Sequence, residues 1–89
     1  MFFAWDPDKA IANFRKHRVT FDEAVTVFAD PSALIAIDDS HWDRAILIGE
    51  SGERRILLVV FIEIDGRDIR IISARRATAH ERKRYEEGS

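Results

Sequence analysis

The fold is decided by the stretch Ile69-Arg70-Ile71-Ile72-Ser73-Ala74-Arg75-Arg76-Ala77-Thr78, which joins an apolar run to a basic segment without a break. The run is β-branched and apolar enough to lie inside a sheet, and two adjacent arginines follow it in place of a turn residue. Thr78 stands three residues before Glu81, the spacing of a capping box at a helix start. The sequence therefore predicts a last strand that carries Arg75 and Arg76 to the mouth of a C-terminal helix.

Two short helices are expected before the sheet. Asp6-Pro7 provides a cap and a first-turn proline, and apolar residues follow at helical spacing over residues 7–17. Thr20 stands three residues before Glu23, so a second capped helix is expected over residues 21–29.

From residue 33 onward the apolar residues follow the spacing of strands, with four strands expected over residues 33–37, 44–49, 55–64 and 69–74. Asp65-Gly66 joins the last two as a hairpin, because both residues tolerate positive φ. This order predicts a single α+β domain over residues 1–89: two N-terminal helices, a four-stranded antiparallel meander and a C-terminal helix.

The strand at 55–64 is apolar on both faces, and the last helix is expected to cover only part of the second face. This leaves room for a protein partner.

The composition excludes several classes of protein. The chain has no cysteine, so it is neither a disulfide scaffold nor a thiolate metal site. No His and carboxylate residues stand at ligand spacing on one element, so no metal and no other cofactor is expected. The sequence shows neither a signal peptide nor a membrane-spanning stretch, which predicts a cytoplasmic protein without membrane contact.

Charge is distributed unevenly along the chain. Residues 1–68 hold 8 Lys and Arg against 13 Asp and Glu, whereas residues 69–89 hold 6 against 3. Such a local basic patch is either a short contact with a phosphate backbone or a solvated basic helix.

Several short motifs spread over nearly the whole chain match one known pattern. They are Trp5-Asp6-Pro7-Asp8-Lys9 with Asn13, Lys16 and His17; Phe21-Asp22-Glu23-Ala24; Val27-Phe28; Asp30-Pro31; Ile48-Gly49; and Ile69 to Arg75 with Glu81 and Tyr85. On these residues the chain resembles the BrnT toxin family. It departs from the family's pattern where Asp38, His41 and Arg44 are packed into seven residues instead of a longer polar loop.

The resemblance implies a RelE-like fold and an endoribonuclease toxin of a type II toxin-antitoxin pair, which cleaves RNA without a metal. It further implies neutralisation by a BrnA-type antitoxin in a dimer of heterodimers, a heterotetramer that contacts operator DNA only through the antitoxin. The alternative is a non-catalytic interaction domain that binds the antitoxin and has lost nuclease activity. A direct DNA-binding regulator is disfavoured by the acidic body and the lack of a helix-turn-helix pattern.

Metal-free RNA cleavage needs a base, an acid and cations for the charge that builds on phosphorus. The candidate catalytic residues are the histidines and arginines His17, His41, Arg44, Arg75 and Arg76, and the candidate RNA-binding residues are Arg70, Arg82 and Tyr85. Strand alternation is expected to put Arg75 and Arg76 on opposite faces. Purely structural interpretations are surface ion pairs for the arginines, a helix C-terminus for His17, and packing of the last helix for Tyr85. His41 is expected in a polar loop.

Overall fold

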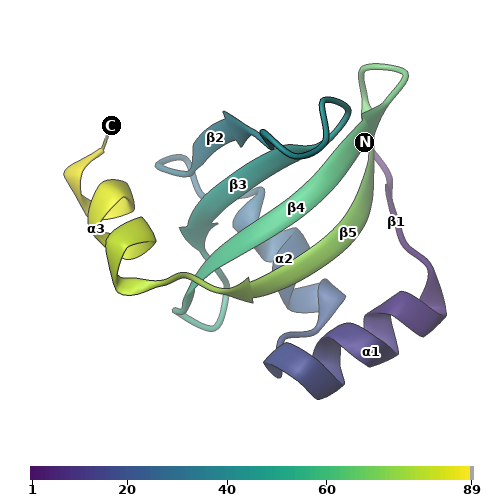
Figure 1. The fold of residues 1–89 in the computed structure, drawn as a ribbon, viewed down its shortest axis with the longest axis horizontal. Coiled ribbons are helices and arrows are strands. Elements are labelled where there is room, and N and C mark those ends of the chain that lie inside the picture. The colour runs from purple at the N-terminus through teal and green to yellow at the C-terminus, as the bar shows by residue number, and fades with distance from the viewer. Residues whose placement is uncertain (89) are drawn as a thin grey trace.

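The computed structural model describes residues 1–88, in which three helices accompany one five-stranded sheet (Figure 1). The elements follow in the order β1 (Phe3–Ala4), α1 (Pro7–His17), α2 (Phe21–Val27), β2 (Leu34–Ile37), β3 (Ala45–Glu50), β4 (Ile56–Ile64), β5 (Asp68–Arg76) and α3 (Ala79–Glu87). The strand order across the sheet is β1-β5-β4-β3-β2. The predicted α+β class and the antiparallel meander of β2 to β5 are confirmed.

The predicted four-stranded sheet lacks one strand that the structure contains. β1 pairs in parallel with β5, Phe3 opposite Ile69, and the Ile69 amide donates to the Phe2 carbonyl at 2.8 Å. Two residues are too few to show an alternation in the sequence, and their partner lies 66 residues away. The sheet is therefore mixed, with one parallel pair at the β5 edge.

The core lies between the sheet and the first two helices. α1 packs against β5, and α2 packs against β3, β4 and β5 and passes behind the sheet in Figure 1. We call this side of the sheet the helix face and the opposite side the outer face. The buried apolar cluster of the helix face is Val19, Phe21, Ala24, Val27, Leu47, Leu57, Val59, Phe61, Ile69, Ile71 and Ala74.

The helix boundaries follow local capping chemistry. Asp6 accepts from the Asp8 amide, Thr20 from the Glu23 amide, and Thr78 forms the predicted capping box with Glu81. α2 ends at Val27, two residues before its predicted end, because the amides of residues 28–30 bond three residues back and turn the chain away from the helix.

A buried amide joins the first helix to the last strand. Asn13, 7 % exposed, donates to the carbonyls of Val19 and Ala74 at 3.0 and 2.8 Å and accepts from the Ala74 amide at 3.1 Å. β1 covers the edge of β5 only at Ile69 and Arg70, so the side chain of Asn13 takes the place of a neighbouring strand further along. This contact fixes the backbone immediately before Arg75.

Candidate functional site

Two of the candidate arginines lie on the outer face of the sheet with one apolar residue between them. Arg70 is paired with Ile62, and the Asp38 amide donates to the Arg44 carbonyl at 3.1 Å, which continues the β2–β3 ladder to Arg44. Ala45 faces the core opposite Phe61, so the preceding Arg44 lies on the outer face. With strands about 4.8 Å apart, the backbones of Arg44 and Arg70 are separated by roughly 10 Å across Ile62.

A β-bulge decides which other arginine shares this face. Phe61 pairs with Ile71 and Val60 with Ser73, so Ile72 is an extra residue in β5. The bulge reverses the alternation that follows it. Arg75 consequently lies on the outer face opposite Leu58, and Arg76 lies on the helix face opposite Leu57.

Arg75 and Arg76 are not brought together. They lie on opposite faces, as strand alternation predicts, and Arg76 is exposed. The guanidinium of Arg75 is engaged by both carboxylate oxygens of Glu81, at 2.8 Å to Oε1 and 2.9 Å to Oε2. Its charge is therefore compensated within the chain.

The same carboxylate holds the last helix to the last strand. Glu81 accepts from the Thr78 amide at 2.8 Å in addition to Arg75, and the hydrogen bond from Arg75 lowers the pKa of Glu81 to about 2. The pairing raises the pKa of Arg75 in turn. Since none of the described residues of α3 is buried, α3 depends on contacts of this kind for its position.

Removal of this charge is expected to change how stability depends on pH. A carboxylate whose folded pKa lies below its ordinary value of 4.5 stabilises the fold above that value and stops doing so as pH falls toward about 2. The difference in free energy of unfolding between wild type and Glu81→Gln should therefore shrink between pH 4.5 and about 2. Glutamine retains a capping side chain, so the comparison isolates the charge. Urea titrations over this range measure it, and a pH-independent difference would contradict it.

The histidines lie at different places in the fold. His41 is in the loop between β2 and β3, close in sequence to Arg44, with its side chain 52 % exposed and Nδ1 3.9 Å from an Asp38 oxygen. His17 is the last residue of α1, one turn beyond Asn13, and is half-buried. It therefore belongs with the helix face, and of these two histidines His41 is the one near the outer-face arginines. His80 is exposed in the first turn of α3.

The two candidates on α3 also differ in their surroundings. Arg82 is exposed. Tyr85 donates its hydroxyl proton to Oδ2 of Asp30 at 2.6 Å, and this bond raises the pKa of Tyr85 to about 12. Asp30 also accepts from the amides of Ser32 and Glu50. Tyr85 therefore anchors α3 to a carboxylate that two backbone hydrogen bonds already hold in place.

The ion pair between Glu23 and Arg55 is not predicted from the sequence. Glu23, 2 % exposed at its side chain, binds Arg55 by a short ion pair and by Nε at 3.0 Å, and accepts from the Ser51 hydroxyl at 2.7 Å. The hydrogen bond from Arg55 lowers the pKa of Glu23. The spacing from Thr20 suggested only a helix cap for Glu23, and no local signal in the sequence joins it to Arg55, 32 residues away.

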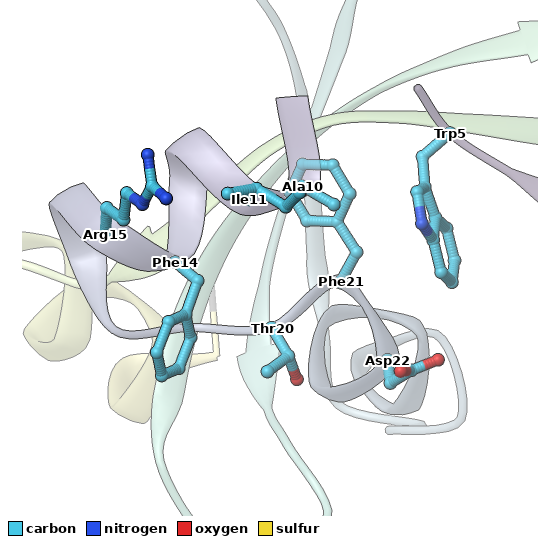
Figure 2. A pocket seen from close by; sticks show the side chains of 8 residues that line it. All are labelled: Trp5, Ala10, Ile11, Phe14, Arg15, Thr20, Phe21 and Asp22. Atoms are coloured by element: carbon cyan, nitrogen blue, oxygen red, sulfur yellow. The ribbon is translucent and has the colours of Figure 1, made fainter. Parts of the chain in front are cut away.

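An apolar groove opens on the other side of the molecule, between α1 and α2 (Figure 2). It has a volume of about 360 Å³ and is lined by Trp5, Ala10, Ile11, Phe14, Arg15, Thr20, Phe21 and Asp22. Arg15 and Asp22 lie toward opposite ends of the groove in Figure 2, so the groove does not bring an acid, a base and a cation together.

Within residues 1–88, no three His, Asp or Glu side chains converge as a metal site. No helix in this part of the chain is both long and apolar enough to cross a membrane.

The fold has a counterpart among solved structures. It matches the crystal structure of the ribonuclease toxin BrnT from Brucella abortus with a TM-score of 0.71 and 26 % sequence identity, over 88 % of this chain and 99 % of that one. Residues 5–81 match the family described as the ribonuclease toxin, BrnT, of type II toxin-antitoxin system. No curated protein sequence matches the chain.

The class that these matches define is that of a toxin of a type II toxin-antitoxin system. The chain belongs to the BrnT family of ribonuclease toxins.

Proposed function

We propose that this chain is an endoribonuclease that binds RNA across the outer face of its sheet and cleaves it without a metal. The observation that carries the proposal is the placement of Arg44 and Arg70 on one face, on either side of Ile62. Among residues 1–88 neither arginine has an ion-pair partner, so both guanidiniums are available to phosphate. Ribonuclease activity is expected because the chain belongs to this family. The register of the strands supports the outer face as the surface that binds RNA.

The chemistry follows from the groups that border this face. His41 takes the proton of a ribose 2′-hydroxyl as its oxygen attacks phosphorus, and the 5′ oxygen leaves with a proton from the medium or from a second acid. Arg44 and Arg70 stabilise the negative charge that builds on the phosphoryl oxygens. Half-buried Val60 and Ile72 offer an apolar floor to the ribose and base.

The partners follow from the type II toxin-antitoxin family. An antitoxin of BrnA type neutralises the toxin in a heterotetramer, and operator DNA is contacted through the antitoxin alone. The pair acts in the cytoplasm, where its RNA substrate lies.

One observation favours a second candidate, an antitoxin-binding domain without nuclease activity. Arg75, the cation at the centre of the strand and helix junction, is engaged by Glu81. A chain of this kind would keep its fold and its partner, while Arg75 would not be free to bind phosphate.

Expression of the chain alone in a bacterial host separates the two candidates. The endoribonuclease is expected to arrest growth and degrade RNA, and the double variant Arg44→Ala/Arg70→Ala is expected to do neither at equal soluble protein. Circular dichroism of both purified proteins checks that the variant folds. Normal growth with soluble, folded wild-type protein would support the interaction domain.

A further inference from the structure

The edge strand β2 exposes an unpaired row of backbone groups. β2 stands at the end of the strand order and pairs only with β3 among the described strands. The bond from the Asp38 amide to the Arg44 carbonyl sets the phase of this antiparallel ladder, in which hydrogen-bonded residues alternate with free ones. The amides and carbonyls of Ile35 and Ile37 therefore point away from β3.

The side chains at this edge are unusually apolar for a surface. Ile35 is 73 % exposed and Ile37 72 %, and Trp42, in the loop that follows β2, is 91 % exposed. Soluble proteins protect such edges with lysine, proline, a bulge or a covering segment. β2 has the sequence Leu-Ile-Ala-Ile, which contains neither lysine nor proline. Its pairing with β3 is regular, so it contains no bulge. An edge of this kind is a template for another strand.

The charges around β2 decide which strand fits. Asp38, Asp39 and Asp43 follow the strand, together with Arg44. Asp30 precedes it, with its carboxylate engaged by Tyr85 and two amides. In a two-fold antiparallel pairing of two copies, the start of one strand faces the end of the other, so acidic residues would meet acidic residues. The occupant is therefore a different chain, with basic residues beside its apolar ones.

We propose that β2 accepts an extended segment of the antitoxin as a sixth strand of the sheet. The segment alternates apolar residues, which cover Ile35, Ile37 and Trp42, and is flanked by Lys or Arg, which face the acidic loops. Main-chain hydrogen bonds to Ile35 and Ile37 give it affinity, and the side chains give it specificity. The proposal rests on the proposed function, because it takes the antitoxin as the partner. It places the antitoxin beside the loop that carries His41 and Arg44.

The test measures binding of the wild-type chain and its variants to the product of the adjacent antitoxin gene, by titration calorimetry. Ile37→Pro removes one outward amide while leaving the bonds to β3 intact, and Ile35→Thr/Ile37→Thr removes apolar surface while leaving the backbone intact. Each is expected to weaken binding at least about tenfold, the effect of losing one main-chain hydrogen bond or the apolar contact. Ile11→Thr on α1 is the matched control, an exposed isoleucine far from the edge, and it is expected to bind as wild type does.

The outcomes separate this proposal from the proposed function. A complex that Ile37→Pro and the double threonine variant leave unchanged, or that only Ile11→Thr weakens, would overturn the edge-strand proposal alone. A wild-type chain that forms no complex would overturn the toxin-antitoxin pairing as well. Light scattering of the isolated chain adds a further arm: a homodimer that Ile37→Pro abolishes would assign the edge to a second copy. Growth arrest by Ile37→Pro expressed alone would show that the variant still folds and cleaves.

Discussion

Replacing Arg70 by alanine in the purified protein is expected to lower RNA cleavage by about 100-fold, the usual cost of removing one donor to a developing oxyanion. The expected cause is loss of a guanidinium that no described carboxylate engages, on the face shared with Arg44. Cleavage of a labelled RNA under single-turnover conditions measures the rate of the chemical step. Arg70→Lys is expected to recover part of the loss, because it restores the charge without the planar fork.

Arg76→Ala is the matched control for this experiment. Arg76 is an exposed arginine of the same strand, but the bulge at Ile72 turns it to the helix face. It is expected to cleave at close to the wild-type rate. A large loss for Arg76→Ala with little effect of Arg70→Ala would move the site to the helix face, near His17, and would contradict the proposed surface.

Replacing Arg55 by alanine is expected to lower the free energy of unfolding by about 3 kcal/mol, because it leaves a buried carboxylate without its counter-ion. The Glu23 side chain is 2 % exposed and keeps only the Ser51 hydroxyl once Arg55 is gone. Arg55 also donates to the Arg18 carbonyl, so the variant loosens the end of α1. Urea denaturation at neutral pH measures the difference.

Two comparisons test the cause of this loss. Arg54→Ala removes a neighbouring exposed arginine. The backbone at this position has φ 63, which strains arginine and alanine alike, so the substitution leaves the backbone strain unchanged. It is expected to change the free energy of unfolding by less than about 0.5 kcal/mol. Glu23→Met/Arg55→Met removes both charges and is expected to be more stable than Arg55→Ala. Equal stability of Arg55→Ala and wild type would show that water reaches Glu23 in the folded chain.

Helices and turns that are specified by residues close together in the sequence could be predicted. Asp6-Pro7, Thr20 and Thr78 each carry a cap within three residues of its partner, and all three helices begin where expected. The turn at Asp65-Gly66 forms with φ 54 and 75, as a tight hairpin requires. β1 carries no such signal, because its partner strand alone makes it a strand.

The candidate site was harder to predict, because its geometry depends on register. The bulge at Ile72 has no mark in the sequence, yet it decides that Arg75 and not Arg76 shares a face with Arg70. The approach of Arg44 to Arg70 requires three strands to be aligned at once. Glu81 was recognised as a helix cap, and its second bond, to Arg75, became visible only in three dimensions.

The bond between Asn13 and Ala74 has a consequence for synthesis of the protein. It joins residues 61 positions apart, and the pairing of Phe3 with Ile69 joins residues still further apart. A nascent chain therefore leaves α1 without its strand until β5 has emerged from the ribosome. The face that carries Arg44 and Arg70 therefore cannot form before β5 is available to pair with β4.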